Sequence, residues 1–279
     1  MTYREARLKA ARMLLDADIE NESAESWFLM EFVCNITRSF YLLHEQDEIP
    51  DDQRHIFFEM TKKRCSHIPL QYLTGEQEFM GLPFKVNENV LIPRQDTEVL
   101  VEEALKVISD GDTVLDMCTG SGCIAVSIKS FRPGAKVIGC DISAAALHVA
   151  RENAKKNDVS VKFVESDLFS NVEGRYDVIV SNPPYIPSDV ILTLMPEVRD
   201  FEPMGALDGK EDGLFFYRKI VEESNNYLVP GGYLLFEIGY DQGDDVSLLM
   251  KKNRFTEIEV IPDLAGLDRV VKGRRKEDV

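Results

Sequence analysis

Residues 113–122 read TVLDMCTGSG, and this stretch decides the fold. A short apolar run typical of a buried strand comes first, and Gly120 and Gly122 follow it directly. A helix that includes Cys123 is expected to follow directly. Strand, glycine-rich turn and helix in this order are typical of an open α/β sheet, where ligands bind beyond the carboxyl ends of the strands.

Strands and helices alternate from Thr97 to the end of the chain. The expected strands are TVLDMC, KVIGCDI, VKFVES, YDVIVSN, YLLFEIG, EIEVIP and RVVKG. The expected helices between them include EVLVEEALKVI, AALHVARENAKK, LFFYRKIVEESNNYL and DDVSLLMKK. This alternation predicts an α/β, Rossmann-like fold with a seven-stranded, mostly parallel sheet covered by helices on both faces. Only a loop separates the last two strands, so we expect them to pair antiparallel.

The N-terminal part of the chain has a different pattern. Residues 1–75 carry apolar side chains at helical spacing, which predicts a small helical domain that recognises a macromolecular partner. Residues 76–95 are expected to form a linking β-hairpin, with strands in EFMGLPFKV and NVLIP and a turn at Asn87-Glu88-Asn89. Residues 96–279 form the expected α/β domain. A length of 279 residues agrees with two domains.

The composition excludes several classes of protein. Hydrophobic residues make up 44% and charged residues 29% of the chain, with no apolar run long enough for a membrane span. The charged N-terminus lacks the apolar core of a signal peptide, so we expect a cytoplasmic protein without a membrane partner. The net charge of -17 weighs against a nucleic-acid substrate. The five cysteines contain no CxxC pair, which favours free thiols and predicts no metal site. Nothing in the sequence implies an oligomer.

Acidic residues end the strands that follow the glycine-rich turn. Asp141 ends the next strand, where its carboxylate can accept hydrogen bonds from both hydroxyls of a ribose. Asp167 follows the third strand and can accept a hydrogen bond from an adenine amino group, although a helix cap or a solvated loop explains it equally well. The turn and Asp141 also match the dinucleotide fingerprint. These residues by themselves fit a nicotinamide cofactor and S-adenosyl-L-methionine equally.

The motif Asn182-Pro183-Pro184-Tyr185, at the end of YDVIVSN, decides between these two cofactors. A planar amide or amine nitrogen is a poor nucleophile because its lone pair is delocalised. The Asn182 side-chain oxygen and the Pro183 carbonyl can accept both hydrogens of such an NH2 group and aim its lone pair at a sulfonium methyl. Pro184 keeps Pro183 extended, and the Tyr185 ring offers a flat face for stacking.

This chemistry needs no general base of matched pKa, because the nitrogen becomes strongly acidic once the methyl group arrives. Catalysis then depends on positioning and on fixed dipoles. The motif therefore predicts a methyltransferase in which Asn182, Pro183 and Tyr185 are the catalytic residues. The structural alternative is a rigid turn that merely ends a strand.

Longer strings make the identification more specific. PLQYLTGEQEFMGLPFKVNENVLIPRQDTEVLV, LDMCTGSGCIA, SNPPYIP and FEPMGALDGKEDGLFFYRKI cover most of residues 69–220 and together resemble the release factor glutamine N5-methyltransferase family. The resemblance implies a class I methyltransferase fold and S-adenosyl-L-methionine as methyl donor, with S-adenosyl-L-homocysteine as product. It implies N5-methylation of the glutamine in the GGQ motif of peptide chain release factors, which modulates translation termination. It also implies that the helical N-terminal domain helps to grip the release factor.

The resemblance assigns roles to residues of this sequence by position. The implied cofactor-binding residues are Cys118, Thr119, Gly120, Ser121, Gly122, Asp141, Asp167, Leu168 and Asn182. The implied substrate-binding residues are Asn182, Pro183, Pro184 and Tyr185.

Two residues depart from the family pattern, since Cys118 and Lys210 stand where glycine is usual. Cysteine is strained at position 118 if the backbone there needs a positive φ. Lys210 lies in an expected loop, where we expect little effect. The family string PRQDT opens the helix EVLVEEALKVI, and we expect Asp96 or Thr97 to cap that helix rather than to serve the pocket. FEPMGAL either shapes the pocket mouth or packs into the core through Phe201.

Other functions use the same residues. A methyltransferase acting on a ribosomal-protein glutamine or on an exocyclic amino group of a nucleic-acid base fits the Asn182 motif as well. The net charge, and the lack of an added basic and aromatic segment for gripping a flipped base, disfavour the nucleic acid. A nicotinamide-dependent oxidoreductase leaves the Asn182 motif unexplained. A non-catalytic binding module leaves the intact motif beside Asp141 unexplained.

Overall fold

The computed structural model describes residues 1–277, and the chain forms two compact units. The helical unit contains Met1–Gly75 together with the later segment Met195–Phe201. The sheet unit contains Glu76–Leu194 and the chain from Glu202 onward. Within residues 1–277, no helix is long and apolar enough to cross a membrane.

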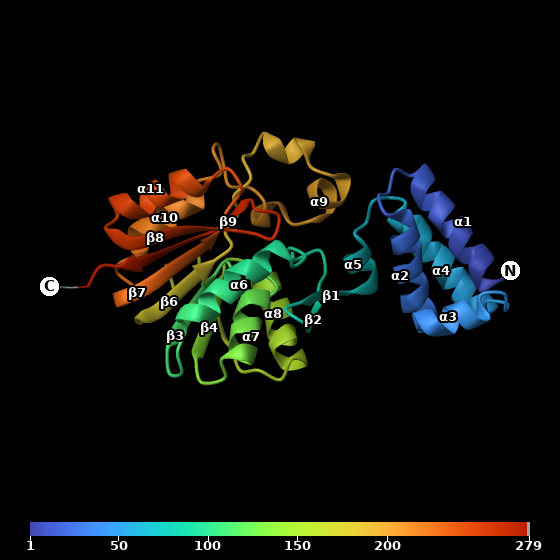
Figure 1. Ribbon diagram of the computed structural model, residues 1–279, viewed down its shortest axis with the longest axis horizontal. Coiled ribbons are helices and arrows are strands. Elements are labelled where there is room, and N and C mark those ends of the chain that lie inside the picture. Colours follow the sequence, from blue (N-terminus) through green and yellow to red (C-terminus); the bar gives the residue numbers. More distant parts are fainter. Residues whose placement is uncertain (278–279) are drawn as a thin grey trace. The chain divides into compact units, whose positions relative to one another are not determined.

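A seven-stranded sheet forms the centre of the sheet unit (Figure 1). Its strands are β3 (Thr113–Met117), β4 (Lys136–Asp141), β5 (Lys162–Glu165), β6 (Tyr176–Ser181), β7 (Leu228–Glu237), β8 (Phe255–Pro262) and β9 (Asp268–Arg275). They lie in the order β5-β4-β3-β6-β7-β9-β8. The pairs β7–β9 and β8–β9 are antiparallel and all the others are parallel, which confirms the predicted sheet and its antiparallel last pair.

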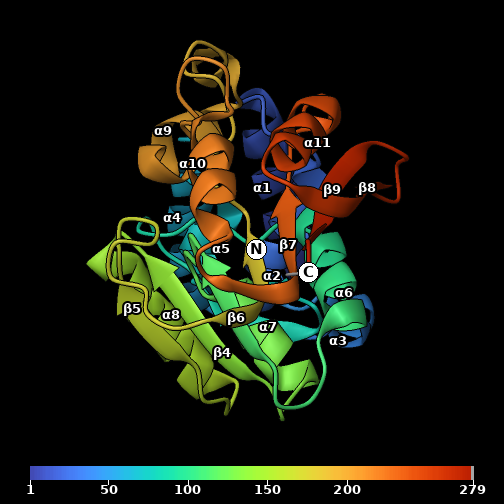
Figure 2. The same ribbon diagram turned by 90° about the vertical axis from the view of Figure 1, so that its left-hand side faces the viewer.

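Helices cover both faces of this sheet because neighbouring strand residues point to opposite sides. These helices are α6 (Asp96–Val107), α7 (Cys123–Phe131), α8 (Ala144–Lys156), α10 (Phe215–Ser224) and α11 (Gly243–Lys252). Two short 3₁₀ turns, η1 (Val190–Thr193) and η2 (Met204–Ala206), lie between β6 and α10 in the chain. Val114 packs in the core that holds α6 and α7, whereas its neighbour Leu115 packs in the core that holds α10 and α11. Figures 1 and 2 show these two helix pairs on opposite faces of the sheet.

The order of the strands places a crevice at one edge of the sheet. From β3 the chain moves outward through β4 and β5, and it then returns to the other side of β3 to add β6 and β7. The carboxyl ends of β3 and β6 therefore flank the point at which the strand order reverses. Ligands of open α/β sheets bind at this point.

The observed β-hairpin is formed almost entirely by the segment EFMGLPFKV, which was expected to be a single strand. Its strands are β1 (Glu76–Phe79) and β2 (Leu82–Lys85), which pair antiparallel around Met80 and Gly81. The predicted strand NVLIP is therefore wrong. The predicted turn at Asn87-Glu88-Asn89 is present, since the Val90 N–H donates to Asn87 O at 3.1 Å, but it does not join the two strands of the hairpin. Met80 and Gly81 both have positive φ, 53° and 71°, which closes a two-residue hairpin turn. Methionine is not typical of turns, so the sequence did not indicate that the chain reverses direction at Met80 and Gly81.

The helical unit packs around one apolar core. It contains α1 (Tyr3–Asp16), α2 (Glu22–Cys34), α3 (Arg38–His44), α4 (Asp51–Arg64), α5 (Leu70–Thr74) and, from much later in the chain, α9 (Pro196–Phe201). Thr2 and Glu5 form a capping box that starts α1. Trp27 and Phe57 are buried in the core of the unit. This burial of an apolar stripe from each long helix holds the unit together.

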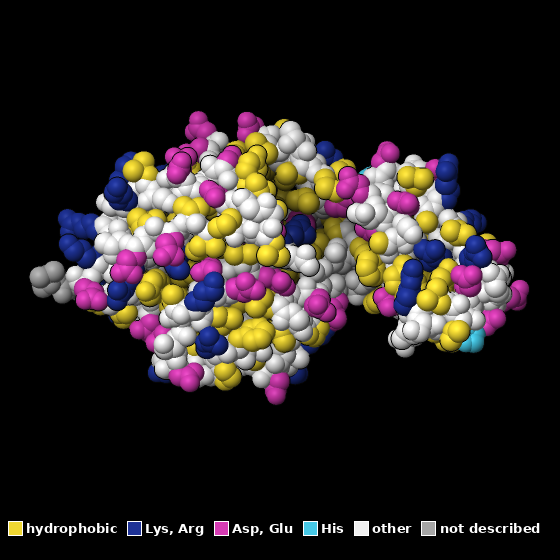
Figure 3. Space-filling model, in the orientation of Figure 1, with side chains coloured by type: hydrophobic (Ala, Val, Ile, Leu, Met, Phe, Trp, Pro, Cys, Tyr) yellow, Lys and Arg dark blue, Asp and Glu magenta, His cyan; other side chains and the backbone are white. Residues whose placement is uncertain are grey.

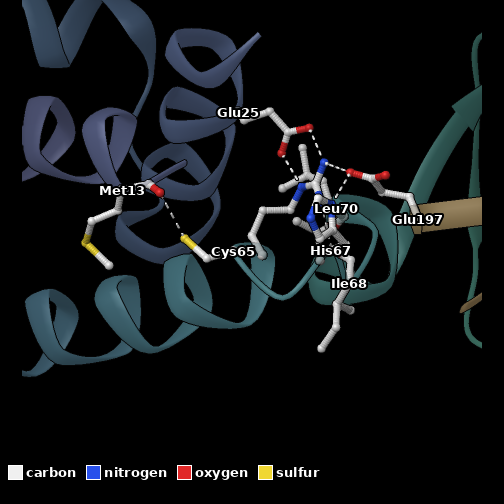
Figure 4. Close-up of polar contacts among 9 residues, drawn as sticks. Met13, Glu25, Cys65, His67, Ile68, Leu70 and Glu197 are labelled. Carbon is white, nitrogen blue, oxygen red and sulfur yellow. Dashed lines mark hydrogen bonds and ion pairs between the residues drawn. The ribbon is translucent and has the colours of Figure 1, made fainter. Parts of the chain in front are cut away.

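A buried arginine holds the later segment in the helical unit (Figure 4). The Arg64 guanidinium donates two hydrogen bonds to Glu25, of 2.8 Å from Nε and 3.2 Å from Nη2. Nη2 also donates to Glu197 Oε1 of α9 at 3.0 Å, and His67 Nδ1 lies 3.3 Å from the same oxygen. Only 6% of the Arg64 side chain is exposed. The carboxylates of Glu25 and Glu197 therefore both bind the buried Arg64 cation, and Glu197 lies 133 residues after Arg64 in the sequence.

Candidate active site

A pocket of about 480 Å³ opens at the carboxyl ends of β3, β4 and β6. Nine of the residues with implied or catalytic roles line it: Cys118, Thr119, Gly120, Ser121, Asp141, Asp167, Leu168, Asn182 and Pro184. Gly122, Pro183 and Tyr185 are not part of its wall. Pocket volumes of this size are typical of small-molecule sites. Within residues 1–277, no cluster of His, Cys, Asp and Glu could hold a metal ion.

The buried carboxylate of Asp116 holds the glycine-rich turn. Asp116 Oδ2 accepts hydrogen bonds from the Thr119 hydroxyl and from the backbone N–H of Ala125 in α7. Burial raises the pKa of Asp116 to about 7, against the lowering effect of those two hydrogen bonds. Gly122 has a φ of 79°, and a Cβ there would lie 3.0 Å from the Ala150 Cβ. Glycine is therefore required for the turn and for the close approach of α8.

Asp141 lies at the predicted place beside this turn. Its Oδ2 accepts a hydrogen bond of 2.9 Å from the Gly120 N–H, and its Oδ1 accepts one of 2.9 Å from the Ser143 N–H. Burial raises the pKa of Asp141, and these backbone donors oppose the rise. Each carboxylate oxygen keeps a further lone pair for a ligand. The side chain is thus fixed in direction and still able to bind hydroxyl groups.

Asp167 and Leu168 follow β5 and also line the pocket. Leu168 has a positive φ of 48°, and its carbonyl accepts a 2.6 Å hydrogen bond from the Ser166 hydroxyl. Ile142, which was not among the expected site residues, is 68% exposed and also lines the pocket. An exposed β-branched apolar residue directly after a strand-end acid is a signal that could have been used.

Cys118 has a φ of 62°, so the condition for strain at this departure from the family pattern is met. Burial raises the pKa of its thiol well above the usual value, and the neighbouring acid Asp141 raises it further. A neutral, buried thiol is a poor nucleophile. Lys210 also has a positive φ, of 69°, at the second such departure. Both substitutions therefore occupy backbone positions that favour glycine.

The Asn182 motif is divided between the pocket and the core. Asn182 and Pro184 line the pocket, whereas the Tyr185 ring packs against the core that includes α10. The Tyr185 hydroxyl donates a 3.4 Å hydrogen bond to Glu237 Oε1 at the end of β7. Burial and then the Glu237 charge raise the pKa of Tyr185. The stacking role of Tyr185 stays a prediction.

The segment after η2 fixes the chain that leaves the motif. The Ile186 N–H donates to Leu207 O at 3.0 Å, and the Gly209 N–H donates to Ile186 O at 2.8 Å. A Cβ on Gly209 would lie only 2.7 Å from the Tyr185 carbonyl carbon. The segment FEPMGALDGKEDG therefore holds the backbone that follows the Asn182 motif in place. Its Pro203–Ala206 part lines the pocket mouth, whereas Phe201 lies in the helical unit.

Thr97 belongs to the pocket and does not cap a helix, so the predicted cap is wrong. The N-cap of α6 is Gln95, with no side-chain hydrogen bond to the helix. The Asn182 amide Nδ2 donates to Thr97 Oγ1 at 3.4 Å, and Thr97 lines the pocket. Asp96 instead lies 3.4 Å from Arg269 Nη2. The helix starts at Asp96, two residues earlier than expected, so Asp96 and Thr97 lie in its first turn and neither occupies the N-cap position.

Comparisons with known proteins identify the family to which the chain belongs. The chain matches the family models "Methyltransferase small domain" over residues 95–193 and "PrmC N-terminal domain" over residues 5–75. A release factor glutamine methyltransferase of Moorella thermoacetica is 41% identical over 284 aligned residues, which cover 100% of each chain. One from Geobacter sulfurreducens is 40% identical over 262 residues, or 94% of this chain and 92% of its own. The chain belongs to the release factor glutamine methyltransferase family.

Membership of this family confirms the resemblance found in residues 69–220 and makes the chain a methyltransferase. It excludes the two alternatives of a nicotinamide-dependent oxidoreductase and of a non-catalytic binding module. A solved methyltransferase from Pyrococcus furiosus, 18% identical, shares the fold with a TM-score of 0.55. That similarity covers 71% of this chain and 91% of the other.

Proposed function

We propose that this chain transfers a methyl group from S-adenosyl-L-methionine to the side-chain N5 of the glutamine in the GGQ motif of peptide chain release factors. The reaction takes place in the cytoplasm and modulates translation termination. One observation carries the proposal: β3 and β6 pair with Met117 opposite Ser181. Asn182 therefore lies beside Cys118 of the glycine-rich turn, and both residues line one pocket. The two relatives named for release factor methylation span 94% and 100% of the chain.

The residues of the pocket fit the methyl donor. Asp141 would bind the ribose hydroxyls with its remaining lone pairs, and Asp167 with Leu168 would flank the adenine. Gly120 has a positive φ of 53° and open space where a Cβ would be, so its backbone is accessible to a ligand. When bound, S-adenosyl-L-methionine supplies a methyl group activated on a sulfonium centre.

The Asn182 motif orients the acceptor. The Asn182 side-chain oxygen would accept one hydrogen of the substrate amide. The Pro183 carbonyl, which lies between the wall residues Asn182 and Pro184, would accept the other, so that the nitrogen lone pair turns towards the donor. Pro184 restricts the direction of the Pro183 carbonyl. The proton leaves after transfer without a dedicated base. The chain thus contributes positioning and fixed dipoles to the reaction.

The helical unit supplies a surface for the release factor. Phe28 and Phe32 lie one turn apart on α2 and are 49% and 50% exposed. Leu43 on α3 is 82% exposed. Large apolar side chains exposed on one small unit are typical of protein-binding surfaces. Figure 3 shows acidic and basic side chains interspersed over the face of the molecule that it displays.

Labelled S-adenosyl-L-methionine tests the proposal with three acceptors: a bacterial release factor, a ribosomal-protein mixture and duplex DNA. We expect one methyl group on the release factor peptide that contains GGQ. Asn182→Ala should lower kcat on that substrate by about 100-fold, the effect of losing one fixed hydrogen-bonding dipole. Transfer only to ribosomal protein or to DNA would replace the proposed substrate by the corresponding alternative.

A further inference from the structure

The side-chain amide of Asn182 has two ends, and only one of them supports the reaction. Its oxygen can accept a hydrogen from a substrate NH2 group, whereas its own NH2 group can only donate. Rotation of the amide by half a turn would place donor against donor. Some neighbouring group must therefore fix the orientation, and Thr97 is the neighbour that contacts the Asn182 nitrogen, at 3.4 Å.

Thr97 alone cannot set this orientation, because a hydroxyl both donates and accepts. Its side chain lies in the first turn of α6, and the residue is only 2% exposed. If the hydroxyl donates elsewhere, its lone pairs receive the Asn182 NH2 group and leave the Asn182 oxygen for the substrate. If the hydroxyl donates to Asn182, the amide is reversed.

Glu237 removes this ambiguity. Its carboxylate ends β7, faces the Thr97 hydroxyl and is 2% exposed. The Tyr185 hydroxyl donates to Oε1, and Oε2 has no partner among the described residues. An ionised carboxylate can only accept. The free acceptor Oε2 would draw the Thr97 proton towards Glu237, which would leave the Thr97 lone pairs for the Asn182 NH2 group.

We propose that Thr97 and Glu237 are positioning residues that hold Asn182 with its carbonyl oxygen towards the substrate amide. This inference rests on the proposed function of the pocket. Neither residue touches the reacting atoms in this account. Both act through the direction of the hydrogen bonds behind Asn182, on the side that faces the core.

The ionisation of Glu237 then controls the site. Burial raises the pKa of Glu237 to about 7, while Thr97 and the Arg269 cation lower it and the Asp96 carboxylate raises it. Tyr185 also faces this carboxyl and lowers its pKa. Below that pKa the neutral acid can donate to Thr97, which can then donate to the Asn182 oxygen. We therefore expect kcat to rise with pH through about 7.

A pair of variants at position 97 separates positioning from packing. Thr97→Val keeps the shape and removes the hydroxyl, so kcat on the release factor should fall about tenfold, as for one lost hydrogen bond. Thr97→Ser keeps the hydroxyl and should restore most of the activity. A fall in kcat without a matching rise in the Kd of S-adenosyl-L-methionine, measured by calorimetry, separates positioning of the acceptor from damage to the cofactor pocket. A Thr97→Val enzyme with wild-type kcat, or a Thr97→Ser enzyme as slow as Thr97→Val, overturns the proposal.

Glu237→Gln provides the second measurement. Its amide cannot ionise and can donate to Thr97, so kcat should be low at every pH and the rise through pH 7 should disappear. Persistence of the same rise in Glu237→Gln would overturn the role of Glu237. Failure of the wild-type enzyme to methylate a release factor would instead contradict the proposed function, which keeps the two failures distinguishable.

Discussion

Cys118 has a strained backbone conformation within the glycine-rich turn. Its φ of 62° lies in the left-handed region, where a side chain costs about 1 kcal/mol and glycine does not. We therefore expect Cys118→Gly to be more stable than Cys118→Ala by about 1 kcal/mol, because both remove the thiol and only glycine removes the strain. Chemical denaturation of the two variants gives the free energies of unfolding.

Ala145 provides the matched control for that comparison. It lies exposed in α8, in an ordinary right-handed helix. Ala145→Gly should lower the free energy of unfolding by about 1 kcal/mol, the opposite direction to the difference at position 118. An alanine variant more stable than the glycine variant at position 118 would contradict the left-handed conformation of that residue.

At the scale of the element, α2 separates its structural face from its recognition face. Trp27 and Leu29 are buried in the core of the helical unit, whereas Phe28 and Phe32 are half-exposed. The double variant Phe28→Ser, Phe32→Ser should raise KM for an intact release factor about tenfold, because two apolar anchors are lost. Steady-state kinetics with the release factor and with a short GGQ peptide measures the effect.

The short peptide cannot reach a surface outside the active site, so its kcat/KM should not change in the α2 variant. Leu248→Ser, which changes a residue of α11 that is 48% exposed, serves as the control for lost surface hydrophobicity. An equal loss for the peptide and the intact release factor would show that α2 acts on folding or on the pocket instead of on recognition.

At the scale of the whole molecule, the chain returns to the helical unit after completing most of the sheet. Glu197 fixes this return through Arg64, and Glu197→Ala should lower the free energy of unfolding of the helical unit by about 2 kcal/mol, as for a lost hydrogen bond between charged groups. Unfolding followed by Trp27 fluorescence measures the change. Glu59→Ala, which removes an exposed pair with Lys62 on α4, should leave the unfolding midpoint unchanged.

The same contact predicts a dependence on pH. Burial pushes the pKa of Glu197 upward, but hydrogen bonds from its own backbone, Arg64 and His67 outweigh it and leave the pKa lowered. Because the folded-state pKa lies below the unfolded value of about 4.3, this carboxylate stabilises the unit above that pH. The stabilisation should disappear as the pH falls through the folded-state pKa, and the loss should be absent in Glu197→Ala.

Local pattern determined the architecture of the sheet unit. The apolar runs, the helices between them and the glycine-rich turn at residues 118–122 each follow from neighbouring residues, so seven strands and the antiparallel last pair could be predicted. The strand-end position of Asp141 and Asn182 followed in the same way, because the carboxyl ends of parallel strands meet at one edge of a sheet. Family motifs then specified the chemistry.

Tertiary structure alone decided the features that join distant residues. Thr97 was expected to cap a helix, but its hydroxyl accepts a hydrogen bond from Asn182, 85 residues away, because the start of α6 packs beside the end of β6. Glu197 joined a helical unit that ends near Gly75 in sequence. Hydrogen bonds between buried charged and polar groups depend on direction and distance in space, and no periodicity along the chain records them.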